Sequence, residues 1–268
     1  MKFSATPPQE RVEQPKPRWT LKRLVNWVKE KFQLEVCRDT IRKTLQKLGL
    51  SWKKAKKLLN KANRQTREEF LATLEGLLND VLHKEHLLIY IDEAHIHLDC
   101  DQGYGWSIKG ERFWISSSSP GRSKVSFYGV YLYNYGLVRI YPFESANQFN
   151  TIEVLKKLRV EFPCIPITAI WDRVSYHRAQ SVKLAAVALK INLEPLPSYS
   201  PDFMPVEHLW QWLREDVTYH TCYQNQGELI KRVEQFVTDI NLNPLALSDR
   251  LWVKNHLEPD EEKLRVSS

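Results

Sequence analysis

The segment that decides the fold opens with Pro166-Ile-Thr-Ala-Ile-Trp-Asp172 and closes with Leu196-Pro-Ser-Tyr-Ser-Pro-Asp-Phe-Met-Pro-Val-Glu207. Its apolar beginning predicts a buried strand that ends at Asp172. Its closing part is rich in proline and serine, which predicts a turn, and Glu207 follows at the start of a predicted helix. The two acids are separated by 34 residues. The segment therefore places one carboxylate after a strand and another at the beginning of a helix.

A third carboxylate follows another apolar run upstream. The run Leu87-Leu-Ile-Tyr-Ile91 predicts a strand with Asp92 at its end. Carboxylates at the ends of three elements can meet at one point and hold Mg²⁺ or Mn²⁺, because these ions prefer oxygen ligands. Two such ions about 4 Å apart can stabilise the attacking and the leaving oxygen of a phosphodiester. Asp92, Asp172 and Glu207 are therefore the predicted catalytic and metal-binding residues.

Together these motifs resemble the DDE signature of the mariner superfamily of transposases, in particular its bacterial insertion sequence 630 branch. The resemblance covers about residues 19–237 and rests on Tyr-Ile-Asp92-Glu, Trp-Asp172-Arg-Val-Ser-Tyr-His177 and Ser-Tyr-Ser-Pro-Asp-Phe-Met-Pro-Val-Glu207-His-Leu-Trp210. It implies a ribonuclease-H-like fold, terminal inverted repeats as the substrate, and a TA dinucleotide as the usual target.

The net charge of +7 is unevenly distributed along the 268 residues. Residues 1–67 contain 19 Lys and Arg against 5 Asp and Glu, an excess of +14, so the remainder carries −7. A basic head on an acidic body predicts that the head binds a polyanion such as double-stranded DNA. A hydrophobic fraction of 43% is sufficient for a packed core.

Two short helices are predicted in the basic head. Thr20 can cap the first, Asp39 can cap the second, and Gly49 can end it. Such a pair is typical of a helix-turn-helix whose second helix enters the major groove. The exposed positions of that second helix are Arg42, Lys43, Gln46 and Lys47. An ordinary helical pair with a basic exterior is the alternative, and the resemblance favours a winged helix-turn-helix.

The most basic stretch follows, from Ser51 to Arg67. Its lysines are predicted to bind phosphates without reading sequence, so that affinity falls with salt; they include Lys53, Lys54, Lys56 and Lys57. Family members usually carry another helix-turn-helix before this one, which is not found here. An upstream partner polypeptide could therefore supply it.

The pattern of apolar runs predicts an α/β fold. Three strands followed by alternating helices and strands indicate a mixed sheet flanked by helices, as a ribonuclease-H-like fold requires. The expected organisation is a flexible arm (1–18), a helix-turn-helix domain (19–67), a linker helix (68–85), a catalytic domain (86–240) and a C-terminal tail (241–268).

Several neighbours of the three acids bear on activity. Glu93 and His177 match residues that the family places beside the catalytic carboxylates. Arg173 stands where the family usually has Asn, and its guanidinium would either compete with the cation for Asp172 or contact the scissile phosphate. The first reading predicts that Arg173→Asn raises metal affinity and cleavage. Met204 also replaces a usual Asn, a potential helix cap worth about 1 kcal/mol.

The sequence also bears on location and on other metals. No apolar run approaches the ~20 residues that span a bilayer, and no signal peptide is evident. We therefore expect a cytoplasmic, nucleoid-associated bacterial protein without a membrane partner. Four cysteines without a Cys-x-x-Cys pair predict neither a zinc ribbon nor a disulfide framework. His95 and His97 near Cys100 could indicate zinc, but such a half-cluster is usually incidental.

Three functions fit these observations. The first is a metal-dependent transposase that uses two Mg²⁺ or Mn²⁺ ions and acts as a homodimer on DNA. The second is a degenerate copy that binds transposon ends without cutting them, consistent with Arg173 and Met204. The third is a cellular nuclease of the same fold. Cleavage of a duplex bearing the transposon end separates the first two.

Overall fold

The chain forms two compact units, which divide between residues 58 and 59. The computed structural model describes residues 19–51, 64–82, 86–117, 123–198 and 200–253. The predicted arm and the phosphate-binding lysines Lys53, Lys54, Lys56 and Lys57 lie outside these residues and stay predictions. No helix in the described ranges is both long and apolar enough to cross a membrane.

The first unit contains α1 (Leu21–Phe32) and α2 (Arg38–Lys47). Thr20 caps α1 as predicted, because its hydroxyl accepts a hydrogen bond from the Arg23 amide at 3.4 Å. The predicted cap of α2 is wrong: the Cys37 sulfur accepts from the Thr40 amide, and Asp39 lies in the first turn. The four residues predicted to reach into the groove are exposed, namely Arg42, Lys43, Gln46 and Lys47.

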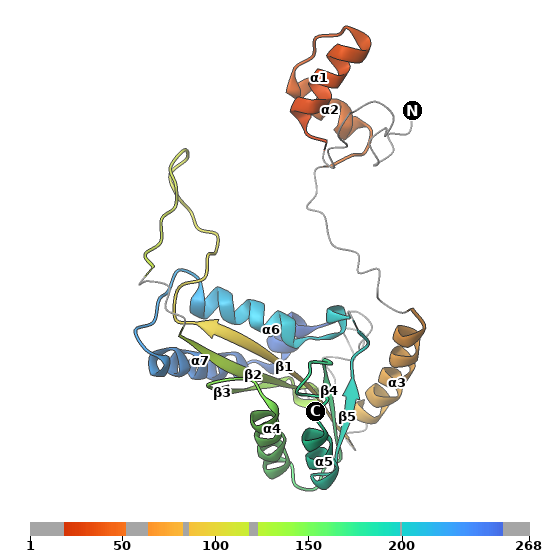
Figure 1. Cartoon of the computed structure of the whole chain (residues 1–268), viewed down its shortest axis with the longest axis vertical. Coiled ribbons are helices and arrows are strands. Elements are labelled where there is room, and N and C mark those ends of the chain that lie inside the picture. Colours follow the sequence, from red (N-terminus) through yellow and green to blue (C-terminus); the bar gives the residue numbers. More distant parts are fainter. Residues whose placement is uncertain (1–18, 52–63, 83–85, 118–122, 199, 254–268) are drawn as a thin grey trace. The chain divides into compact units, whose positions relative to one another are not determined.

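The second unit is built on a five-stranded mixed sheet of order β3-β2-β1-β4-β5 (Figure 1). Its strands are β1 (Leu87–His97), β2 (Lys124–Leu132), β3 (Leu137–Phe143), β4 (Ile167–Trp171) and β5 (Ile191–Pro195). β1 pairs antiparallel with β2 and parallel with β4. The predicted mixed sheet is therefore confirmed, with β1 at its centre.

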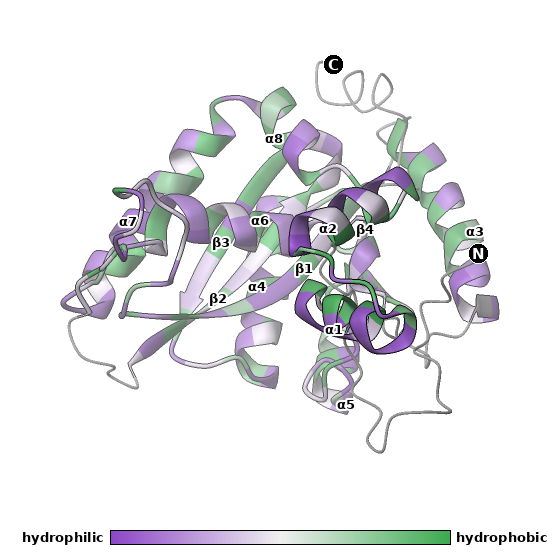
Figure 2. Ribbon diagram, turned by 90° about the horizontal axis from the view of Figure 1, so that it is seen from above, coloured by the Kyte–Doolittle hydropathy of each residue, from purple (hydrophilic) through white to green (hydrophobic). Residues whose placement is uncertain are grey.

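Side chains of β1 alternate between two cores. Leu88 and Tyr90 pack with residues of α3 (Arg64–Leu82), α6 (Val206–Leu213), α7 (Gln226–Asn241) and α8 (Pro244–Leu251). Leu87 and Ile89 pack with α4 (Gln148–Glu161) and α5 (Gln180–Ala188) on the other face. The helices alternate hydrophilic and hydrophobic residues along their length, as expected for helices that cover a sheet on one side (Figure 2). Both faces of the sheet are thus covered, and polar groups that need access must lie at its ends.

Two segments that the sequence predicted to be a linker and a tail contribute residues to the core of the second unit. The predicted linker helix begins at Arg64, and it buries Phe70 and Leu74 in the same core as β1. The expected tail begins with the end of α7 and then forms α8, in which Leu247 and Leu251 are buried. Helix α8 was not predicted from the sequence. Its apolar spacing is recognised as that of a helix only when the core that receives its apolar residues is known.

Candidate active site

The three predicted carboxylates line one cleft. Asp92 comes from β1, Asp172 directly follows β4, and Glu207 lies in the first turn of α6. Arg173 and Met204 line the same cleft. The structure therefore brings together side chains that are up to 115 residues apart in the sequence.

The sequence predicted that Asp92 ends its strand, and this prediction is wrong. β1 continues to His97, and Asp92 lies opposite Gly129 of β2 in the antiparallel register. Successive side chains of a strand point to opposite faces. Asp92 therefore faces α6, whereas Glu93 faces the side covered by α4 and α5. The two adjacent acids thus lie on opposite faces of the sheet.

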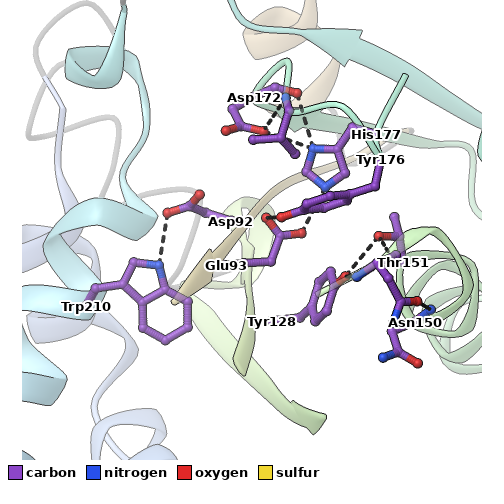
Figure 3. Close-up of polar contacts among 11 residues, drawn as sticks. Asp92, Glu93, Tyr128, Asn150, Thr151, Asp172, Tyr176, His177 and Trp210 are labelled. Atoms are coloured by element: carbon purple, nitrogen blue, oxygen red, sulfur yellow. Dashed lines mark hydrogen bonds and ion pairs between the residues drawn. The ribbon is translucent and has the colours of Figure 1, made fainter. Parts of the chain in front are cut away.

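Trp210 holds the Asp92 carboxylate in place. Its Nε1 donates a hydrogen bond to Asp92 Oδ2 at 2.9 Å (Figure 3). The indole fits only because residue 129 is glycine, since a Cβ there would lie 2.6 Å from the Trp210 ring. Sequence reasoning missed this role, although Trp210 lies three residues after Glu207, on the same face of the helix.

Burial and the neighbouring acids change the protonation of Asp92. Burial first, and then the charges of Glu93, Glu207 and Asp172, raise its pKa to about 7 against the opposing effect of the Trp210 hydrogen bond. A carboxylate held in this way takes up a proton near neutral pH unless another cation is present. The site thus has a deficit of positive charge that a divalent metal ion would fill.

A buried histidine connects Asp172 with Glu93. His177 Nδ1 lies 2.9 Å from Asp172 Oδ1, and Nε2 lies 2.8 Å from Glu93 Oε1 (Figure 3). The side chains of His177 and Glu93 are 1% and 5% exposed, whereas that of Asp172 is 41% exposed. His177 therefore supports Asp172 from inside the protein and leaves the outer side of its carboxylate open to the cleft.

The surroundings of His177 favour its charged form. Burial alone would lower the pKa of His177, but hydrogen bonds to Asp172 and Glu93 outweigh it and raise the pKa to about 9. The imidazole stacks on Trp171, with ring centroids 4.4 Å apart and planes at 7°. Tyr176, which sequence reasoning also missed, donates its hydroxyl to Glu93 at 3.3 Å. These contacts form a cationic bridge between two acids.

Arg173 does not diverge from the site, as adjacent side chains at a strand end usually do. It lines the cleft with Asp172, and its Nε donates a hydrogen bond to the Leu196 carbonyl oxygen at 2.9 Å. Asp172 is held by His177 and by the Val174 amide, and its pKa is lowered from the usual value although burial opposes this. The guanidinium is thus fixed by a backbone oxygen on the wall of the cleft.

The turn before Glu207 is fastened to α3. Arg67 forms two hydrogen bonds to the Asp202 carboxylate, at 2.6 and 3.1 Å, and a third to Ser200 Oγ at 2.7 Å. Its guanidinium also lies 4.3 Å from the centroid of the Phe203 ring. Arg67 was expected to bind phosphate with the basic stretch, but here it holds the Ser-Pro-Asp turn that leads into α6.

Met204 has a different role from the missing cap that the sequence suggested. Its side chain is buried in the core beside α6. The helix begins at Val206, and the Glu207 amide donates to the Met204 carbonyl oxygen at 3.2 Å. An asparagine at this position would bury an amide side chain, so Met204 is a packing residue here.

The charged bridge predicts how stability depends on pH in metal-free protein. The pKa of His177 rises from about 6.5 in the unfolded chain to about 9 in the folded one. Its stabilisation, on the order of 3 kcal/mol, is fully present below about pH 6.5 and is lost as the pH rises through about 9. Urea unfolding in EDTA should therefore show a decline in the free energy of unfolding over this range.

His177→Gln should remove this decline. His97→Gln, which changes an exposed histidine of β1, should leave it intact and serves as the control. A decline that persists unchanged in His177→Gln would contradict the assignment of the charge to His177.

Two protein-family models match parts of the chain. Residues 87–230 match the model of the DDE superfamily endonuclease family. Residues 15–74 match the winged helix-turn-helix family. The two matches overlap the predicted catalytic domain (86–240) and the predicted helix-turn-helix domain (19–67).

Individual relatives point in the same direction. The chain is 25% identical over 230 residues to the insertion element IS630 uncharacterized 39 kDa protein of Shigella sonnei, which covers 85% of this chain and 66% of that protein. The fold of this chain is similar to that of Mos1 transposase in a paired-end complex with the left transposon end, with a TM-score of 0.59 and 18% identity. The match covers 97% of this chain and 81% of the Mos1 chain. A Mos1 mariner paired-end complex with Mn gives a TM-score of 0.58 at 16% identity. The chain belongs to the DDE superfamily endonucleases, is similar in sequence to an insertion element IS630 protein, and is similar in fold to Mos1 transposase.

Proposed function

We propose that the chain is the transposase of a bacterial insertion sequence. In the first reaction, water attacks a phosphodiester at the transposon end and releases a 3′-hydroxyl and a 5′-phosphate. In the second, that 3′-hydroxyl attacks a target phosphodiester, and the target's own 3′-oxygen leaves. The observation that carries the proposal is the meeting of Asp92, Asp172 and Glu207 in one cleft.

The donor set fits Mg²⁺ or Mn²⁺. All three side chains are carboxylates, which these hard cations prefer, and the pKa of Asp92 is raised by burial and by the negative charge of the neighbouring acids. When bound there, two ions would activate the attacking oxygen and stabilise the leaving one. The relatives' structures include a complex solved with Mn and one solved with Mg.

The protein's own residues would orient this site. Trp210 fixes Asp92, and the charged His177 fixes Asp172 while its other nitrogen is held by Glu93. Arg173 lies on the cleft wall, where a guanidinium can pair with the scissile phosphate. These contacts hold the reacting groups in place before DNA binds, which lowers the cost of reaching the transition state.

The partners follow from the same proposal. The helix-turn-helix of residues 19–67 would bind terminal inverted repeats, with α2 in the major groove and Lys53 to Lys57 on phosphates. The enzyme would act as a homodimer on DNA in the cytoplasm, at the nucleoid, and join ends to TA targets. An upstream polypeptide that carries a further helix-turn-helix is an additional candidate partner.

Cleavage of an end-bearing duplex tests the carboxylates. Asp92→Asn, Asp172→Asn and Glu207→Gln should each reduce Mg²⁺-dependent cleavage to background while binding of the duplex persists, because a neutral amide holds a divalent cation poorly. Asp249→Asn, at an exposed position of α8, should cut normally. Full cleavage by any of the three variants would remove that residue from the site. A wild-type chain that binds ends but cuts with neither Mg²⁺ nor Mn²⁺ would support the degenerate binding protein instead.

Arg173 tests the phosphate contact. Because its guanidinium is bonded to Leu196 and not to Asp172, we now expect Arg173→Asn to lower cleavage and to leave metal affinity unchanged. Loss of a charged hydrogen bond of about 1.5–3 kcal/mol predicts roughly a tenfold to hundredfold decrease. Arg173→Lys should retain part of the activity. An increase in both metal affinity and cleavage would instead restore the competing-charge explanation.

Salt dependence tests the DNA-binding head. Replacing Lys53, Lys54, Lys56 and Lys57 by Ala should reduce the slope of log affinity against log salt by up to about 4, without changing sequence preference. The matched Lys→Arg variant should keep the slope. Gln46→Ala should instead relax preference by about 1–3 kcal/mol if α2 reads bases. An unchanged slope in the alanine variant would place the phosphate contacts elsewhere.

A further inference from the structure

A second cluster of metal-binding side chains lies at the base of the loop that follows β1. Asp99 and Cys100 come two and three residues after this strand, and Cys222 comes from the segment after residues 214–218. One ligand atom of each lies within 4.8 Å of the others. None of the three lines the DDE cleft. Cys222 is the distant partner that the sequence could not place beside Cys100.

The atoms of this cluster already have the spacing of a zinc site. Cys222 Sγ lies 3.3 Å from Asp99 Oδ1. The sulfurs of Cys100 and Cys222 lie 3.4 and 3.3 Å from the same atom, the carbonyl oxygen of Ser116. In a tetrahedral site with Zn–S of about 2.3 Å and Zn–O of about 2.1 Å, neighbouring ligand atoms are about 3.6–3.8 Å apart. These three contacts would therefore lengthen by only a few tenths of an ångström, and the remaining side-chain ligand atoms start within 4.8 Å of one another.

The two segments that carry the ligands are fixed to each other. The Asp101 amide donates to the Thr218 carbonyl oxygen at 2.9 Å, and the Tyr223 amide donates to the Leu98 carbonyl oxygen at 2.8 Å. In the sequence Cys100 lies between Leu98 and Asp101, and Cys222 lies between Thr218 and Tyr223. The thiols are thus held close together by backbone hydrogen bonds on both sides.

The Asp99 carboxylate is oriented by a further contact. Ser117 Oγ donates to its two oxygens at 2.9 and 2.8 Å. Hydrogen bonds of this kind to a ligating carboxylate orient it toward a metal ion. Both thiols meanwhile donate to one carbonyl oxygen, so two protons converge where one cation could replace them.

We propose that Asp99, Cys100 and Cys222 bind a Zn²⁺ ion, with the Ser116 carbonyl oxygen directed at the fourth position. Thiolate ligands select Zn²⁺ over Mg²⁺ and Mn²⁺, so this site differs in chemistry from the carboxylates of the cleft. Binding replaces the two thiol protons, which are released to solvent, and Asp99 contributes a carboxylate oxygen. The ion would join residues 99–100 and 116 at the two ends of the loop to Cys222.

Cobalt substitution of the full-length, reduced protein tests the site. Co²⁺ should bind with release of about two protons and with thiolate-to-metal charge-transfer absorption, which the carboxylates of the cleft cannot produce. One equivalent of Zn²⁺ should then abolish this absorption without further proton release. Cys100→Ser and Cys222→Ser should lose this absorption. Cys164→Ser, which changes an exposed cysteine, should retain it. Ser117→Ala should weaken Zn²⁺ binding about 10- to 100-fold.

A measurement on the wild-type chain covers the case in which the serine variants fail to fold. Zn²⁺ should protect Cys100 and Cys222 from alkylation but not Cys164, as read by mass spectrometry of the peptides. Equal alkylation with and without Zn²⁺ would overturn the proposal. So would reduced protein that binds no Zn²⁺ and an oxidised form with a Cys100–Cys222 disulfide, since the cluster would then be a thiol pair only.

Discussion

Negative charge gathered around one buried carboxylate is the constraint on which the arrangement of the site depends. Asp92, Glu93, Asp172 and Glu207 gather where β1, β4 and α6 meet, and burial of Asp92 together with the charges of the other three acids raises its pKa to about 7. Each of these acids either accepts a hydrogen bond from a particular side chain or faces the cleft. Such a cluster destabilises the folded chain unless a cation balances it, so binding and stability are linked at this point.

The central strand divides the acids between two environments. Because side chains of β1 alternate, Asp92 meets Trp210 on the α6 side and Glu93 meets His177 on the other. His177 then returns to Asp172, so the two faces of the sheet are joined through one imidazole. Gly129 belongs to the same arrangement, since its missing side chain is what admits the Trp210 ring. Neighbouring positions in sequence thus have separate tasks.

Hard and soft ligands are separated within the second unit. Carboxylates line the cleft, whereas the thiols of Cys100 and Cys222 lie together at the base of the loop after β1. Arg67 adds a structural connection of another kind, because it binds α3 to the Ser-Pro-Asp turn before Glu207. The helix that follows the DNA-binding head in sequence is therefore packed directly against the turn that positions a catalytic candidate. A movement of α3 would therefore also displace the turn that precedes Glu207.

The sequence by itself determined the strands, most helices and the three carboxylates, because local periodicity and turn residues specify elements and motif spacing identifies the acids. It misjudged features that depend on what lies across the fold. β1 runs past Asp92 because β2 offers it a partner, α8 is a helix because a core receives Leu247, and Met204 is buried instead of capping. Only the tertiary structure joined Trp210 to Asp92, His177 to Glu93 and Cys222 to Cys100. These contacts span 84 to 122 residues of sequence, over which no local pattern carries information.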